Sequence, residues 1–290
     1  MPRHLLSIDD LSRDELLALT EPALRPAPAA AGLRGTLAML FQQPSLRTMS
    51  SFAHAGTQFG LAPIAVTSTG NALRDQCDFN DEVMQLGLTS SCVVARTTYT
   101  LDAALFSDMQ APLINAGDGD NEHPTQSLVD VATMRHFGLD GKLVAFVGNP
   151  KHRVNNSLVM ALRKLDVRMC FVCPPGLRAA RGYLDDAVPC ITAETAAHVD
   201  AALGDASYVY LTPVQHTSAP TPLPGDAYTF DLARATRALR EGARILHPFP
   251  RLGELAKDLD GSPFDAYQCQ TGLGPEIRRR TLALVLGTVH

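Results

Sequence analysis

The sequence has no apolar run approaching the ~20 residues that a membrane-spanning helix needs, so we expect no membrane span. Its first residues do not form a charged segment followed by an apolar one, so we expect no secretion. The net charge is only −5, which argues against bulk binding of nucleic acid. Any anionic ligand must therefore be bound by a local basic pocket.

The six cysteines are scattered along the chain and form no paired metal-binding pattern. Cys170 and Cys173 have C-x-x-C spacing, but the surrounding segment 167–172 is typical of a buried strand. A zinc site needs a second pair of ligands, and the sequence contains none that is evident. We therefore predict ordinary buried thiols, no metal, and a cytoplasmic location for this thiol-rich chain.

What the sequence does contain is a globular chain long enough for two domains, with 290 residues, 46% hydrophobic and 19% charged. Helical and strand patterns alternate along it. We expect helices at 11–20, 50–60, 81–87, 127–136, 155–164, 193–199 and 275–286, and strands at 35–41, 62–66, 92–95, 112–115, 143–147, 167–172, 208–211 and 243–246. Repeated strand–helix units predict right-handed crossovers and parallel sheets. A glycine-bounded turn at 138–141 looks like a hinge, so the predicted fold is α/β, with two doubly wound parallel-sheet domains and a ligand site in the cleft between them.

A polar, turn-rich segment ending in His-Pro-Thr-Gln is the most informative local feature. It precedes an apolar-periodic helix that Asn121 or Thr125 can cap and whose first turn suits Pro124. His123 and Gln126 are then expected to project from the helix N-terminus. Free N–H groups and partial positive charge favour an anionic substrate there.

A second segment has the same design at an earlier loop-to-helix junction. Ser45 and Thr48 supply hydroxyl groups, and the Arg47 guanidinium matches a phosphate in a bidentate manner. Alternatively, Ser45 is only a helix cap and Arg47 only a surface charge. A third segment, 247–251, reads His-Pro-Phe-Pro-Arg.

These three segments, in this order, resemble the aspartate/ornithine carbamoyltransferase family, and the aspartate branch more than the ornithine branch. The resemblance runs nearly from end to end. It implies a carbamoyl-phosphate-binding domain at 1–137, a second-substrate (amino-acid) domain at 138–274, and a C-terminal helix at 275–290 that packs back on the first domain. It also implies transfer of the carbamoyl group of carbamoyl phosphate to an amino-acid amine, in pyrimidine biosynthesis, by a homotrimer without a cofactor.

The resemblance also assigns roles to individual residues. Arg96 follows the strand 92–95 and matches the arginine that bridges phosphate and carbonyl oxygen; the alternative is a strand-end arginine in solvent. His123 is expected to donate to the carbonyl oxygen and Gln126 to bind the carbamoyl amide. The expected carbamoyl-phosphate-binding residues are Ser45, Leu46, Arg47, Thr48, Arg96, His123, Gln126 and the backbone carbonyls of Pro248 and Phe249. Those expected to act in catalysis are Arg47, Thr48, Arg96, His123 and Gln126, and those expected to bind the acceptor are Arg153 and Gln215.

The sequence also departs from the family pattern. Leu46 replaces the first threonine of Ser-Thr-Arg-Thr, so its N–H remains and a hydroxyl is lost. The region 68–81, where aspartate-accepting members carry a serine and a lysine, has no lysine; Arg74 is the available cation. Pro213 replaces a second carboxylate-binding arginine, so aspartate is expected to bind poorly unless Lys151, His152 or His216 compensates.

Three functions remain open from the sequence. The chain is an active aspartate carbamoyltransferase, an enzyme for another aspartate-like amine, or a catalytically impaired homologue that serves a partner enzyme as a structural or regulatory subunit. A regulatory chain or a dihydroorotase is compatible with each as a further partner. A nucleotide-binding domain is disfavoured, because the segment 148–153 lacks the glycine spacing of a dinucleotide turn.

Overall fold

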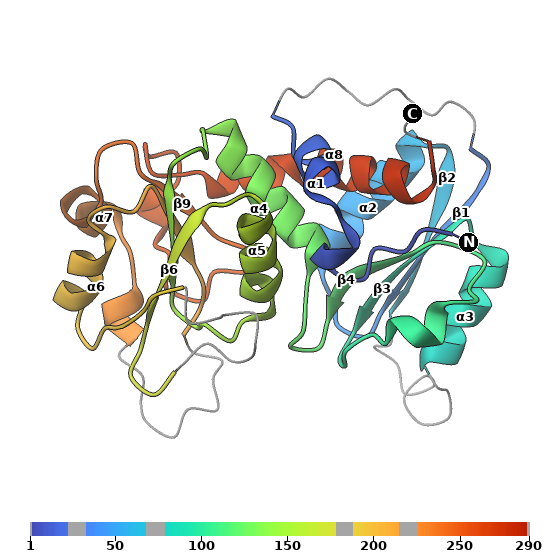
Figure 1. Ribbon diagram of the computed structural model, residues 1–290, viewed down its shortest axis with the longest axis horizontal. Helices are drawn as coiled ribbons and strands as arrows, with labels where there is room; N and C mark the ends of the chain where they lie inside the picture. Colours follow the sequence, from blue (N-terminus) through green and yellow to red (C-terminus); the bar gives the residue numbers. More distant parts are fainter. Residues whose placement is uncertain (1, 23–32, 68–78, 178–187, 215–224, 289–290) are drawn as a thin grey trace. The chain divides into compact units, whose positions relative to one another are not determined.

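The computed structural model describes residues 2–22, 33–67, 79–177, 188–214 and 225–288. The chain divides into two compact units: unit 1 comprises Met1–Val129 and Leu273–His290, and unit 2 comprises Asp130–Gly272. Both divisions fall inside helices, α4 (Pro124–His136) and α8 (Tyr267–Val285) (Figure 1). The domain limits predicted from the sequence, 137 and 274, stay predictions.

Unit 1 is built around a four-stranded parallel sheet with strand order β2-β1-β3-β4. In the central register, Leu37 of β1 lies opposite Pro63 of β2 and Cys92 of β3. Its elements are the 3-10 helix η1 (Ile8–Asp10), α1 (Arg13–Leu19), β1 (Gly35–Phe41), α2 (Leu46–Gln58), β2 (Leu61–Thr67), α3 (Phe79–Thr89), β3 (Cys92–Thr97), η2 (Ala103–Phe106), β4 (Leu113–Asp118) and the start of α4.

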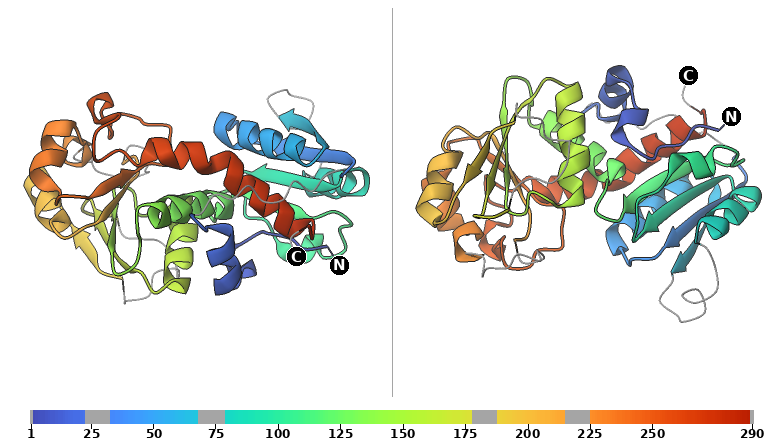
Figure 2. Two further views of the ribbon diagram at one scale, coloured as in Figure 1. Left: turned by 90° about the horizontal axis from the view of Figure 1, so that it is seen from above. Right: turned by 60° about the horizontal axis from the view of Figure 1, so that its bottom comes forward.

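The strand order of unit 1 reverses direction once. The chain moves outward from β1 to β2 through α2, and then returns past β1 to β3 through α3. Because such crossovers are right-handed, α2 and α3 cover opposite faces of the sheet (Figure 2). One face packs a core cluster that includes Ala38, Val93 and Phe106.

Unit 2 repeats this architecture with a five-stranded parallel sheet of order β7-β6-β5-β8-β9. Here the order reverses between β5 and β8. Its elements are the rest of α4, β5 (Leu143–Val147), α5 (Arg153–Lys164), β6 (Arg168–Cys173), β7 (Cys190–Thr192), α6 (Ala196–Leu203), β8 (Tyr208–Leu211), η3 (Gly225–Tyr228), α7 (Leu232–Ala238), β9 (Arg244–Leu246), η4 (Lys257–Leu259) and the start of α8. Two parallel sheets with flanking helices confirm the predicted α/β fold class.

Several element limits differ from the sequence prediction. Helix α2 begins at Leu46 and not at residue 50, so its first turn contains the predicted phosphate residues. Helix α8 begins at Tyr267 and continues through Pro275, although proline lacks the N–H that an interior helical position donates. The exposed edge strand β7 and the short helix α7 were not predicted, because neither carries a clear apolar period.

The cysteines do not all follow the expectation of buried thiols. Cys170 and Cys173 are buried on β6 as predicted, but Cys190 on β7 is exposed and its Sγ lies 3.1 Å from that of Cys173. Within the described ranges, no group of three or more His, Cys, Asp or Glu side chains is arranged to hold a metal ion. In that same part of the chain, no helix combines the length and apolar character that crossing a membrane requires.

Candidate active site

The carboxyl ends of three neighbouring strands gather the polar residues of unit 1. The turn after β1 leads into α2, Arg96 is the penultimate residue of β3, and the loop after β4 leads into α4. β1 and β3 flank the point at which the strand order reverses, and in doubly wound sheets ligands bind outside the strand ends at such a point. The topology therefore favours a ligand site at this edge.

The first turn of α2 presents the segment predicted to bind phosphate. Ser45 occupies the N-cap position, but among the described residues its hydroxyl makes no capping hydrogen bond and instead donates to Thr48 Oγ1 at 3.0 Å. The first intrahelical bond is from the Met49 N–H to the Ser45 carbonyl, so the N–H groups of Leu46, Arg47 and Thr48 precede it. The Arg47 side chain is exposed, and so is that of Leu46, at 84%. The arrangement combines backbone donors, a hydroxyl pair and a cation.

Arg96 is held at the end of β3 and does not extend freely into solvent. Its Nη1 donates to the carbonyl of Ala116 on β4 at 3.1 Å, and the side chain is half-buried. The Gln42 N–H donates to the Arg96 carbonyl at 2.8 Å, which joins the end of β3 to the turn after β1. This fixed guanidinium lies on the same sheet edge as the α2 segment.

The N-terminus of α4 supplies the histidine and glutamine. The helix begins at Pro124, so the capping position falls on His123, whose carbonyl accepts from the Gln126 N–H at 3.0 Å. Neither predicted cap residue has that role: the Asn121 amide donates to Asp118 Oδ2 at 3.0 Å, and the Thr125 hydroxyl lies 3.5 Å from His123 Nδ1. His123 is buried and Gln126 half-buried.

Two carboxylates that brace this loop were missed by the sequence analysis. Asp118 accepts from the N–H groups of Glu122 and Leu101, at 2.9 and 3.0 Å, besides Asn121. Glu122 accepts from the Ser7 hydroxyl at 2.6 Å and from the Ile8 N–H at 3.1 Å. A buried carboxylate with several donors rigidifies a loop. The partners of Glu122 are 115 and 114 residues away and give no local signal, whereas those of Asp118 lie within 17 residues of it.

In unit 2, Arg153 opens α5 directly after the turn that follows β5. It is half-buried, and the preceding His152 caps the helix by accepting from the Val154 N–H at 3.5 Å. Gly148 permits a close approach of β5 and β8, since a Cβ added there would lie 2.0 Å from the Thr212 carbonyl oxygen. Arg153 thus lies beside the reversal point of the second sheet. Gln215 lies outside the described residues.

The segment after β9 carries the two predicted backbone acceptors. Pro248 and Phe249 are half-buried, and the Phe249–Pro250 peptide bond is cis. Phe249 has φ of 53°, in the left-handed region that non-glycine residues seldom adopt. The structure thus places Ser45, Arg47, Thr48, Arg96, His123 and Gln126 in unit 1, and Arg153, Pro248 and Phe249 in unit 2.

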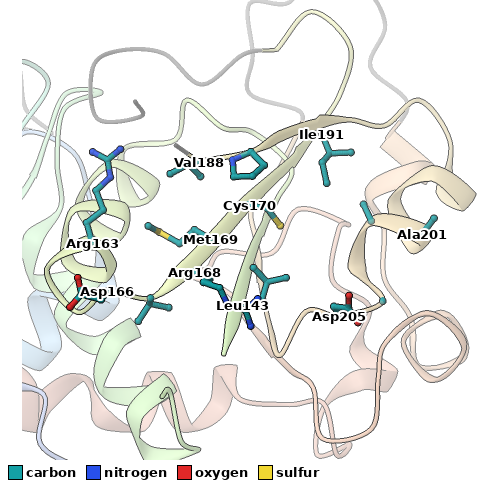
Figure 3. A pocket seen from close by; sticks show the side chains of 14 residues that line it. Leu143, Arg163, Asp166, Arg168, Met169, Cys170, Val188, Ile191, Ala201 and Asp205 are labelled. Atoms are coloured by element: carbon teal, nitrogen blue, oxygen red, sulfur yellow. The ribbon is translucent and has the colours of Figure 1, made fainter. Parts of the chain in front are cut away.

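A cavity of about 790 Å³ is found elsewhere in unit 2 (Figure 3). It is lined by β6, β7 and the end of α6, including Met169, Cys170 and Ile191. None of the described residues predicted for catalysis or substrate binding lines it. This cavity is therefore separate from the residues to which the sequence assigns chemistry.

Comparison with known proteins decides the family. Residues 3–136 match the family model described as aspartate/ornithine carbamoyltransferase, carbamoyl-P binding domain. The aspartate carbamoyltransferase catalytic subunit of Methanothermobacter thermautotrophicus is 32% identical, over 99% of this chain and 96% of that protein. The chain belongs to the aspartate/ornithine carbamoyltransferase family. The catalytic subunit of Vibrio campbellii, 34% identical over 98% of this chain and 96% of its own, supports the aspartate branch.

Solved structures of the aspartate carbamoyltransferase branch have the same fold. The catalytic subunit of the aspartate transcarbamoylase of M. jannaschii superimposes with a TM-score of 0.82 at 30% identity and covers 99% of this chain and 98% of its own. The enzyme of Trypanosoma cruzi in complex with carbamoyl phosphate and aspartate gives 0.82 at 25% identity, over 97% of this chain and 96% of its own. The chain is thus a transferase of the aspartate carbamoyltransferase kind.

Proposed function

We propose that this protein transfers the carbamoyl group of carbamoyl phosphate to the amine of aspartate, or of an aspartate-like amino acid, and releases phosphate. The observation that carries the proposal is the shared strand edge of unit 1. It supplies helix N–H groups, two guanidiniums and an imidazole within a segment that matches the carbamoyl-phosphate-binding family model. The same reaction is implied by the T. cruzi relative, which was crystallised with carbamoyl phosphate and aspartate.

Each group has a chemical task in this mechanism. Arg47, with the hydroxyls of Ser45 and Thr48 and the N–H groups of the first turn, binds the phosphate dianion. Arg96 and His123 donate to the carbonyl oxygen, on which negative charge grows as the amine attacks. Gln126 holds the carbamoyl amide, whose N–H groups need acceptors such as the carbonyls of Pro248 and Phe249. The loss of one hydroxyl at Leu46 leaves the backbone donor in place.

The amine attacks the carbamoyl carbon directly in this proposal. The C–N bond forms, the C–O bond to phosphate breaks, and the leaving phosphate accepts the amine proton. No nucleophilic cysteine or serine is required, because Ser45 is committed to the phosphate and His123 to the carbonyl oxygen. Rate enhancement then comes from holding two substrates in an attacking geometry and from stabilising the oxyanion.

The residues of unit 2 bear on which amine accepts the carbamoyl group. Arg153 at the start of α5 offers a guanidinium for one carboxylate. Pro213 is buried two residues after the end of β8, where the family pattern has a second arginine, so a second carboxylate loses its partner. We therefore infer that aspartate binds weakly, or that an amine with a single carboxylate is the natural acceptor. Arg74 and Gln215, which bear on this question, lie outside the described residues.

We also propose a homotrimer and a role in pyrimidine biosynthesis, both on the strength of the family resemblance. The alternative role, a catalytically impaired structural or regulatory subunit, receives no support from the catalytic subunits that the chain resembles. A cytoplasmic location and a regulatory or dihydroorotase partner stay predictions.

The decisive test has two steps. Calorimetric titration measures the affinity of the protein for carbamoyl phosphate. A mass-spectrometric screen across amino acids then identifies carbamoylated products. We expect binding of carbamoyl phosphate and an N-carbamoyl product with aspartate or a related acid. Binding without any carbamoylated product would support the structural or regulatory role instead.

A further inference from the structure

A buried histidine–carboxylate pair lies at the end of β9, beside the backbone acceptors of the proposed site. His247 Nε2 lies 2.6 Å from Glu254 Oε1, with side-chain exposures of 0% and 6%. Glu254 also accepts from the Leu252 N–H, at 3.1 Å through Oε1 and 3.0 Å through Oε2. Two buried polar side chains with so many contacts impose a specific geometry on the loop between them.

The hydrogen bonds fix which nitrogen of His247 carries the proton. The Phe249 N–H donates to His247 Nδ1 at 2.8 Å, and because a backbone N–H can only donate, Nδ1 must present its lone pair. The single ring proton is therefore on Nε2, where it points to Glu254. His247 is a neutral imidazole in one tautomer, which the Phe249 N–H at Nδ1 and the Glu254 carboxylate at Nε2 favour together.

The charge state of Glu254 agrees with this assignment. Burial raises the pKa of the carboxyl, but the hydrogen bond from His247 and the N–H donors outweigh burial and hold the pKa below its usual value. Glu254 is then an ionised acceptor near neutral pH. Such a charge-assisted bond is stronger than one between neutral groups.

The imidazole of His247 in turn restrains the backbone of Phe249 through its hydrogen bond from the Phe249 N–H. Its left-handed φ of 53° is unfavourable for a residue with a Cβ, and such conformations persist only where the surroundings over-determine them. The bond to His247 Nδ1 provides one restraint. The Phe249 ring provides another, at 5.8 Å from that of Tyr267 and beneath Arg251, whose Cζ lies 5.2 Å from the ring centre. The carbonyls of Pro248 and Phe249 take their direction from this turn.

The main chain of His247 is restrained as well. Its N–H donates to Gln270 Oε1 at 2.9 Å, and Gln270 Nε2 donates to Asp130 Oδ1 at 2.6 Å. Both partners are buried within unit 2, on α8 and α4. The backbone of His247 is therefore fixed, and the orientation of its ring is set by the contacts at its two nitrogens, Glu254 at Nε2 and the Phe249 N–H at Nδ1.

We propose that Glu254 is a positioning residue for carbamoyl transfer: it locks His247 in the Nε2–H tautomer, and His247 thereby aims the carbonyls of Pro248 and Phe249. The proposal rests on the proposed function, in which those carbonyls accept from the carbamoyl amide. Glu254 itself touches no reacting atom. Its removal disturbs the reaction through the tautomer and the turn.

The test compares Glu254→Ala with Glu254→Gln. Glutamine retains an oxygen that accepts from Nε2–H, whereas alanine leaves no acceptor. Nitrogen-15 NMR of the His247 ring, assigned with a His247→Gln variant, reports the tautomer without reference to activity. We expect wild type and Glu254→Gln to show the Nε2–H form and Glu254→Ala to show a mixture of tautomers.

Kinetics provide the second readout. Glu254→Ala is expected to lose about 10²-fold in kcat/KM for carbamoyl phosphate, as small misplacements of binding groups do, and Glu254→Gln to recover most of it. Asp200→Ala is the matched control: it breaks the ion pair with Arg234 in the same unit, at 2.7 Å, and is expected to leave kcat/KM unchanged.

Two results would overturn the assignment: an unchanged tautomer in Glu254→Ala, or a folded Glu254→Ala with wild-type kcat/KM. If Glu254→Ala unfolds, the Glu254→Gln variant decides, since a changed tautomer in that variant contradicts the proposal. A wild-type protein that forms no carbamoylated product would refute the proposed function, whereas the tautomer measurement would still judge the His247–Glu254 pair.

Discussion

The hydroxyl of Tyr210 on β8 donates a hydrogen bond of 2.8 Å to the carboxylate of Asp130 on α4. Both side chains are fully buried, and Gln270 donates to the other carboxylate oxygen. Burial and the adjacent Asp130 raise the pKa of Tyr210 well above its ordinary value, so the hydroxyl keeps its proton and remains a donor. The pair ties the part of α4 that belongs to unit 2 to the sheet of that unit.

Removing this donor should destabilise the fold. We expect Tyr210→Phe to lower the free energy of unfolding by about 1–3 kcal/mol, because a buried carboxylate oxygen loses its partner. Urea denaturation followed by circular dichroism measures the change. Tyr99→Phe, which removes a partly exposed bond to Asn80 in unit 1, is the control and should cost less. Equal losses of unfolding free energy in the two variants would contradict the prediction that the buried Tyr210 hydrogen bond contributes more to stability.

Arg47 should dominate phosphate affinity. We expect Arg47→Ala to weaken binding of carbamoyl phosphate and of inorganic phosphate by roughly 10²-fold, since a charge-assisted contact in the first turn of α2 is lost. Calorimetry measures the affinity of each variant for both ligands. Arg34→Ala removes an exposed arginine that precedes β1 in the same unit and should leave affinity unchanged. Wild-type affinity in Arg47→Ala would remove this residue from the site.

His123 should affect turnover more than binding. We expect His123→Ala to lower kcat by ~10²–10³-fold with phosphate affinity largely intact, as for loss of one oxyanion donor. His136→Ala, at the exposed end of the same helix, is the control and should behave as wild type. Ping-pong kinetics or a carbamoylated enzyme in mass spectra would argue instead for a covalent route.

Pro213 should limit the use of aspartate. The wild-type enzyme is expected to saturate only at high millimolar aspartate, and an acceptor with one carboxylate should compete well. Pro213→Arg restores a guanidinium and should lower KM for aspartate by about tenfold, whereas Pro213→Ala removes the ring alone and should not. Steady-state kinetics distinguish the variants. A low-millimolar KM in the wild type would mean that another cation already occupies the role of the missing arginine.

Assembly provides the last prediction. The family resemblance implies a homotrimer with active sites at subunit boundaries. The polar segment 71–80 is predicted from the sequence to lie near a neighbour's phosphate site, and its residues 71–78 lie outside the described residues. We expect sedimentation equilibrium at micromolar concentration to report a mass near three chains of 31.1 kDa. A monomer as the only species would contradict the homotrimer and would leave the segment without its expected neighbour.

Sequence patterns predicted those parts of the protein that depend on neighbours in the chain. The apolar strands β1 and β5 and the helix after Pro124 were all predicted from local periodicity. The start of α2 and the passage of α8 through Pro275 were not, because tertiary packing outweighs local propensity at such positions. Glu122 and Glu254 escaped notice for a related reason. The structural role of each glutamate depends on a partner that only the fold brings near, Ser7 for Glu122 and His247 for Glu254.

Unit 1 combines residues 1–129 with residues 273–290, so the order in which the chain is synthesised affects when this unit can complete its fold. Arg280 on α8 donates to the carbonyls of Leu19 and Glu21, at 3.2 and 2.8 Å, and Arg278 lies over the ring of Phe52, 5.5 Å from its centre. During synthesis these first residues leave the ribosome long before α8 exists, whereas unit 2 is continuous and emerges whole. The half of the protein whose translation begins first is therefore the half that finishes folding last, because residues 1–129 wait for the end of α8 to complete their unit.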